Sequence, residues 1–189
     1  FDLGSIQFTD ATGQPIREFK PAEFAVDIAF AQQFSDFFSG GIAVRYVNSN
    51  LTGGLNVNNA NTKAGQTVAA DVSVYYQKPD LQLGDNTGTF AFGLNISNIG
   101  AKLSYSETAK RDFIPMNLRL GPRFTYNMDE FNSISIHFDA NKLLVPTPPI
   151  YALDENSQPI FDTVANSYVI ASGKDPDVGV AQGLFQSFS

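Results

Sequence analysis

The single histidine, His137, is the first residue to examine for catalysis, because histidine is the commonest general acid or base. It stands near Asp139 and Asn141 in a segment that alternates apolar and polar residues. A hydrolase also needs a nucleophile beside its base, and no serine stands in a Gly-flanked elbow. We therefore predict that this chain is not an enzyme, with no catalytic residue. His137 is expected to belong to a hydrogen-bond network on its strand.

Metal and cofactor sites have no better support. The chain has no cysteine and one histidine, which leaves only carboxylates as ligands. Asp154 and Glu155, like Asp175 and Asp177, lack the regular oxygen spacing of a calcium loop. The pair Gly53–Gly54 precedes no predicted helix, so it is interpreted as a turn and not as a phosphate-binding loop. We expect no metal and no cofactor.

Composition excludes several broad classes of protein. A net charge of −7 and a pI near 4.5 argue against nucleic acid as a partner. With 43% hydrophobic and 16% charged residues the chain is too apolar for disorder. No apolar run approaches the roughly 20 residues of a membrane-spanning helix. The sequence starts at Phe1 without a leader-like segment, so we expect its targeting signal outside these 189 residues.

Alternation with period two dominates the rest of the chain and predicts β-strands with two different faces. One face is large and apolar, and the other consists mostly of Ala, Gly, Ser and Asn, called here the small-residue face. A phase slip after Ile96 predicts a β-bulge near residues 98–100, after which Ile99, Ala101, Leu103 and Tyr105 are expected to continue the apolar face. The alternating segments are 24–34, 42–46, 68–76, 90–105, 114–126 and 134–141.

The composition of the two faces favours a membrane barrel over a soluble sandwich. A soluble antiparallel sheet exposes many Lys, Glu and Thr residues on its polar face, and these are scarce here. The apolar face, with Phe, Val, Ile and Leu and with Tyr near strand ends, suits lipid and an aromatic girdle. We therefore predict an all-β fold, a transmembrane antiparallel up-and-down β-barrel. A soluble sandwich or lipocalin-like barrel is the alternative.

The connections between these segments divide into short and long ones. If strands alternate up and down, short turns at 35–38 and 127–131 fall on one side together with 78–88. Long connections at 51–65, 106–112 and 146–177 fall on the other side, an asymmetry typical of outer-membrane barrels. We expect one partial barrel domain over 1–189: an outer-loop hairpin in 1–23 with strands 3–9 and 15–19, six membrane strands in 24–145, a long outer loop at 146–177, and the start of a further strand at 178–189.

Charged residues on the small-residue face could line a water-filled path or pair with one another, and we favour pairing. A turn centred near Asp36 sets Asp27 against Arg45, and a turn centred near Asp129 sets Arg119 against Asp139. Pro146 is expected to end strand pairing, whereas Pro148 and Pro149 are left open as a partner contact. The predicted lumen-facing structural charges are Asp27, Arg45, Asp71, Arg119, Arg123, His137 and Asp139. No partner-binding residue is assigned.

Four stretches follow one another along the chain: "PAEFAVDIAFAQQFSDFFSGGIAVRYVNSNL", "FGLNISNIGAKLSY", "FIPMNLRLG" and "DEFNSISIHFDANKLLVPTPP". Together and in this order they resemble the PorV family of the type IX secretion system. The resemblance implies a FadL-like barrel of about fourteen strands, of which this chain is roughly half. It also implies a bacterial outer-membrane location, with long loops outside the cell and short turns in the periplasm.

The function implied by the resemblance is protein transport. Such a protein binds the C-terminal signal domain of secreted cargo and shuttles it from the translocon to the surface attachment machinery. The implied partners are the large translocon barrel of type IX secretion, cargo signal domains, the surface sortase or attachment complex, and membrane lipid. The alternatives are a FadL-like outer-membrane channel for hydrophobic small molecules and a soluble carbohydrate- or lipid-binding β-protein.

Overall fold

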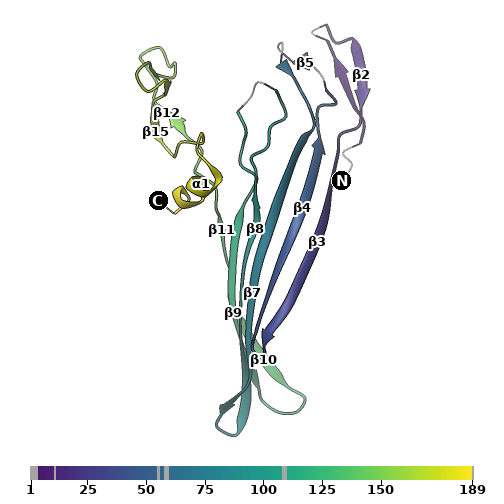
Figure 1. The fold of residues 1–189 in the computed structure, drawn as a ribbon, viewed down its shortest axis with the longest axis vertical. Helices are drawn as coiled ribbons and strands as arrows, with labels where there is room; N and C mark the ends of the chain where they lie inside the picture. The colour runs from purple at the N-terminus through teal and green to yellow at the C-terminus, as the bar shows by residue number, and fades with distance from the viewer. Residues whose placement is uncertain (1–3, 11, 55, 58–59, 108–109, 189) are drawn as a thin grey trace. The chain divides into compact units, whose positions relative to one another are not determined.

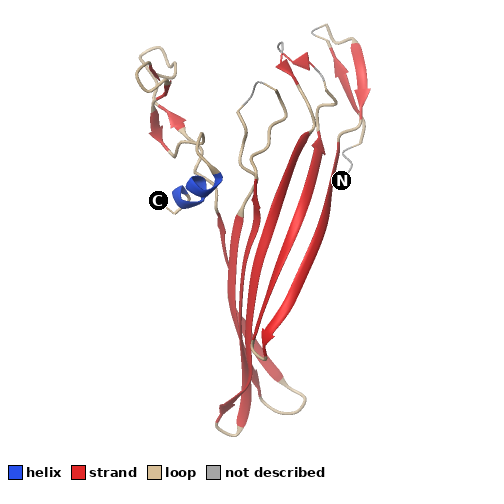
Figure 2. Ribbon diagram, in the orientation of Figure 1, coloured by secondary structure: helices blue, strands red, loops and turns tan. Residues whose placement is uncertain are grey.

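The structure, a computed structural model, describes residues 4–10, 12–54, 56–57, 60–107 and 110–188. These residues form antiparallel strands and one short helix, so the predicted all-β class is confirmed (Figure 2). The chain divides into two compact units, Phe1–Lys142 and Leu143–Ser189, where the sequence suggested one domain.

The first unit is built around one large sheet (Figure 1). Its strand order is β10-β9-β8-β7-β4-β3, with β11 also pairing with β9, so each long strand pairs with its neighbour along the chain. This is the expected up-and-down arrangement, with β10 and β11 together in the place of the sixth strand. The strands are β3 (Ala22–Ser35), β4 (Phe38–Asn50), β7 (Gly65–Leu83), β8 (Asn86–Gly100), β9 (Asn117–Asn127), β10 (Ser133–His137) and β11 (Ala140–Leu143).

The strand register gathers the apolar residues into rows on one face of the sheet. One row runs across five strands: Phe30, Ile42, Val72, Ile96 and Leu118 are successive partners. Phe30 is 63% exposed and Ile42 is 57% exposed, so no second sheet covers this face in the described chain. A soluble sandwich would bury such a row, so the exposed row favours the lipid-facing interpretation.

Short turns join the strands at one end of the sheet. β3 and β4 are joined through Asp36 and Phe37, as predicted, and residues 128–132 join β9 to β10. The expected connection at 78–88 is shorter than predicted, because β7 continues to Leu83 and β8 begins at Asn86. An irregularity between Lys78 and Leu81 absorbs Pro79, which cannot donate to the ladder.

Smaller hairpins lie in the connections of the first unit. The predicted N-terminal hairpin is present as β1 (Ile6–Thr9) and β2 (Pro15–Phe19), whereas Leu3 lies outside the described residues. The Asp10 carboxylate accepts hydrogen bonds from the Thr12 hydroxyl and backbone N–H and from the Gln14 N–H; these bonds lower the pKa of Asp10. Two short strands, β5 (Asn56–Val57) and β6 (Ala60–Asn61), pair within the β4–β7 connection.

The predicted bulge is present and Ile99 pairs with Ala70 on the apolar face as expected, but Leu103 and Tyr105 do not follow that face. Ser97 and Asn98 together oppose Asp71, and the regular strand ends at Gly100. Leu103 and Tyr105 then lie against Gly65, where an added Cβ would come within 2.9 Å of both side chains.

The hydroxyl of Tyr105 reaches Ser49 Oγ at 2.9 Å, across the width of β7. Ser49 lies on the small-residue face, so Tyr105 covers that face and the prediction that it continues the apolar face was wrong. The glycine at position 65 leaves the space that the ring needs.

The second unit consists of short pairs of strands and a helix. The strands are β12 (Ile150–Tyr151), β13 (Phe161–Asp162), β14 (Ser167–Tyr168) and β15 (Ile170–Ser172). Residues 178–189 were expected to begin a further strand, but the structure has the helix α1 (Val180–Gln186) there. A strand needs a partner for its backbone groups, whereas a helix supplies its own, here beginning with the bond from Gly183 N–H to Gly179 O.

Among the described residues, no helix is both long and apolar enough to cross a membrane.

Candidate functional site: the charged face of the sheet

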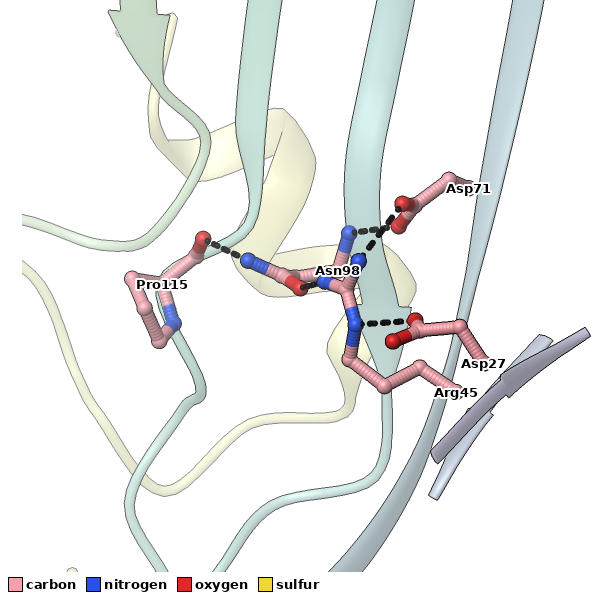
Figure 3. Close-up of polar contacts among 5 residues, drawn as sticks. All are labelled: Asp27, Arg45, Asp71, Asn98 and Pro115. Atoms are coloured by element: carbon pink, nitrogen blue, oxygen red, sulfur yellow. Dashed lines mark hydrogen bonds and ion pairs between the residues drawn. The ribbon is translucent and has the colours of Figure 1, made fainter. Parts of the chain in front are cut away.

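Three of the predicted charges meet on the small-residue face. Asp27 of β3 and Arg45 of β4 are direct cross-strand partners, as predicted from the short turn between their strands. Asp71 comes from β7, the neighbour of β4 on the edge away from β3, and also contacts Arg45 (Figure 3).

Arg45 uses all three of its guanidinium nitrogens in this cluster. Its Nε donates to Asp27 Oδ1 at 2.5 Å, its Nη1 donates to Asn98 Oδ1 at 2.8 Å, and its Nη2 lies 3.4 Å from Asp71 Oδ2. The Asp71 side chain is the most covered of the three charged groups, at 18% exposed, against 30% for Arg45 and 43% for Asp27. The guanidinium therefore bridges two carboxylates that would otherwise repel each other.

Asn98 links this charge cluster to the β-bulge. Its φ of 59° is left-handed, a conformation that Asn adopts more readily than most residues. Its backbone N–H donates to Asp71 Oδ1 at 2.7 Å, and its Nδ2 donates to Pro115 O at 3.0 Å (Figure 3). The cluster thus joins β3, β4, β7, β8 and the start of the return to β9. The sequence analysis predicted the bulge but missed the role of Asn98.

The predicted pair of Arg119 and Asp139 is absent, although both residues are described. The register of β9 and β10 pairs Ser133 with Asn127 and His137 with Arg123, two residues away from the expected alignment. Asp139 instead lies against Gly121, where its Oδ1 would be 2.2 Å from an added Cβ.

The shape of the turn explains this difference. The Asp129 carboxylate accepts hydrogen bonds from the Asn132 side chain and from the N–H groups of Phe131 and Asn132, while Met128 N–H donates to Asn132 O. The turn is therefore centred on Glu130 and not on Asp129. The bond from the Asn132 side chain, followed by that from Phe131 N–H, holds the pKa of Asp129 below its usual value.

A proline also interrupts the outermost strand. Phe138 N–H donates to Pro122 O at 3.1 Å, but Pro122 has no N–H with which to return the bond. Strand pairing stops after His137 and resumes at Ala140, which separates β10 from β11.

A groove of about 630 Å³ lies beside this interruption. Arg119 and Asp139 both line it, although they form no ion pair with each other. Arg123 and His137 face each other in register nearby, and neither side chain makes a hydrogen bond with another described residue. Their assignment to a barrel lumen stays a prediction.

Among the described residues, no group of three or more His, Asp or Glu side chains is placed to hold a metal ion. The arrangement of the charged face is that of a hydrogen-bonded scaffold around Arg45 with a polar groove beside it.

No curated protein matches the sequence. The family model described as "Type IX secretion system protein PorV" matches residues 1–150, which include the large sheet and the Arg45 cluster. This match covers well over half of the 189 residues, and the chain belongs to the PorV family of type IX secretion system proteins.

Proposed function

We propose that this protein is an outer-membrane component of type IX secretion that binds the C-terminal signal domain of secreted cargo. It then passes the cargo from the translocon to the surface attachment machinery. The observation that carries this proposal is the family match over residues 1–150.

The large sheet supports a place in the outer membrane. Its apolar rows are exposed across β3, β4 and β7, with Ile28 at 78%, Val44 at 52% and Val68 at 54%. Exposed apolar surface on this scale is costly in water, whereas a bilayer covers it at no such cost. The opposite face holds the Arg45 cluster, to which we assign a structural role inside the barrel.

The proposed orientation places the long connections outside the cell and the short turns in the periplasm. Residues 51–64 and the whole second unit would then be available to partners at the surface. Single cysteines at Glu130 and Asn156, both exposed, test this in intact cells with a membrane-impermeant thiol reagent. We expect labelling at position 156 only. The reverse pattern would invert the orientation.

The function is tested by capturing the tagged full-length protein from a detergent extract of the outer membrane. We expect a large translocon barrel and cargo that retains its signal domain to co-purify. Recovery of lipid or small hydrophobic molecules without cargo or translocon would contradict the shuttle and support the FadL-like channel. A matched extract from cells whose cargo lacks the signal domain is the control.

A further inference from the structure

Residues 150–172 form a compact three-armed element, called here the trefoil. Three chain segments meet at Ala152, Ile160 and Val169, and their backbones close a ring of hydrogen bonds. Ala152 N–H donates to Val169 O at 2.8 Å, Val169 N–H to Ile160 O at 2.9 Å, and Ile160 N–H to Ala152 O at 2.9 Å. Short two-stranded ribbons are marginal alone, so this ring gives the three arms a common anchor.

Each of the three arms is a short pair of antiparallel segments that extends from the ring of hydrogen bonds. The first is β12 paired with β15, which connects the trefoil to the rest of the chain. The second is closed by the bridge between Leu153 and Pro159, and the third is β13 paired with β14.

Aspartates shape the turns at the tips of the second and third arms. Asp154 Oδ1 accepts from the N–H groups of Asn156 and Gln158, at 2.8 and 2.9 Å. Asp162 Oδ1 accepts from Val164 N–H at 2.8 Å and from Ala165 N–H at 3.1 Å. Such turns hold the tips in one conformation, which reduces the entropy that binding would cost.

The trefoil presents an aromatic cluster near the ring. The ring centroid of Tyr168 lies 5.5 Å from that of Tyr151 and 5.2 Å from that of Phe161. The three residues are 36–50% exposed, and Val164 at the tip of the third arm is 96% exposed. Tyrosine is one of the residue types enriched among the side chains that anchor protein interfaces.

The surface of the trefoil is also acidic. Residues 150–172 carry the carboxylates Asp154, Glu155 and Asp162 and contain no Lys or Arg. A partner that fits must therefore present an apolar patch bordered by basic side chains. The family match ends at residue 150, so the trefoil after Ile150 lies beyond the part of the chain that the family model describes.

We propose that the trefoil is the surface that recognises the cargo signal domain, through its aromatic cluster, the apolar tip at Val164 and its acidic rim. This proposal rests on the proposed function, and the signal domain is the partner to which we assign the apolar patch and basic border.

The test uses the full-length protein in detergent and the purified signal domain of a cargo secreted by the same cell, immobilised on a sensor. Val164→Asp places a charge at an almost fully exposed tip, so it leaves the packing of the trefoil intact. We expect it to weaken binding about tenfold or more, as for an interface anchor. The matched control is Ile16→Asp, at a 63% exposed position on the N-terminal hairpin, and its affinity should stay within about twofold of the original.

A second variant tests the charge of the rim. Glu155 is exposed, and Glu155→Lys should lower the association rate several-fold and reduce its dependence on salt. If the unaltered protein binds the signal domain and both trefoil variants bind equally well, the trefoil proposal is overturned and the shuttle function stands. If the unaltered protein does not bind the domain at all, the shuttle function itself fails.

Discussion

The Arg45 cluster allows the two roles of Asp71 to be separated by two substitutions at one position. Asp71 Oδ1 accepts the backbone N–H of Asn98 at 2.7 Å, while Oδ2 lies 3.4 Å from Arg45 Nη2. Asp71→Asn keeps an oxygen for the bulge N–H but removes the charge. Asp71→Ala removes the charge and the oxygen, so the backbone N–H of the left-handed residue Asn98 loses its acceptor.

The expected magnitudes follow from geometry and exposure. A partly buried hydrogen bond to a charged group contributes about 1.5–3 kcal/mol. The contact with Arg45 is long, and the Arg45 side chain is 30% exposed, so solvent screening limits it to about 1 kcal/mol or less. We therefore expect Asp71→Asn to lower the free energy of unfolding by about 1 kcal/mol and Asp71→Ala by about 2–4 kcal/mol.

Equilibrium unfolding of the full-length protein in urea, in lipid vesicles, measures both variants. Asp139→Asn is the control, because the Asp139 carboxylate forms no ion pair or hydrogen bond with another described residue, and we expect a change below about 0.5 kcal/mol. Equal losses for Asp71→Ala and Asp71→Asn would refute the argument that this carboxylate holds the bulge. Cargo capture should survive in both variants, since the cluster is proposed as scaffold.

Three further predictions test the faces, the outer strand and the periplasmic-side turn. Val72→Arg on the apolar row should lower the free energy of unfolding in vesicles by about 2–4 kcal/mol. Ser73→Arg, on the opposite face beside the groove, should lower it much less. Equal losses would contradict the face assignment. Gly121→Ala should lower the free energy of unfolding by about 1–3 kcal/mol, because the new Cβ would overlap the Asp139 side chain and lie 3.0 Å from Phe138 O. The same change should speed amide hydrogen exchange in β10 and β11. Unchanged exchange would count against the close approach. Asp129 has a lowered pKa in the folded protein, so it stabilises the fold above its unfolded pKa of about 3.9, and this contribution is lost as pH falls through the folded value. The stability difference between the original protein and Asp129→Ala should therefore shrink on acidification below about pH 4, and a difference that grows there would contradict the sign.

Much of the sheet was predictable from the sequence because side-chain alternation is a local property. Strand residues point to opposite faces in turn, so the pattern in 24–34 and 42–46 predicted both strands and their faces. The pairing of Asp27 with Arg45 followed as well from a turn centred near Asp36, and the structure reaches that register through an irregularity between Gln33 and Ser35 beside the two-residue connection. The phase slip likewise located the bulge within one or two residues of Asn98.

Only the tertiary structure decided the contacts that depend on turn geometry and on distant chain segments. Arg119 and Asp139 do not pair because the five residues between β9 and β10 form a turn centred one residue later than expected, which moves the partner positions by two. Tyr105 reaches Ser49 because Gly65 leaves room beneath the aromatic ring of the tyrosine. The cycle of backbone hydrogen bonds through Ala152, Ile160 and Val169 joins three segments, and no sequence pattern in any of them predicts its contact with the others. Alternation in the sequence predicts on which face of the sheet a residue lies. The register and the long-range packing depend on the path of the backbone between strands, and no local sequence pattern predicts that path.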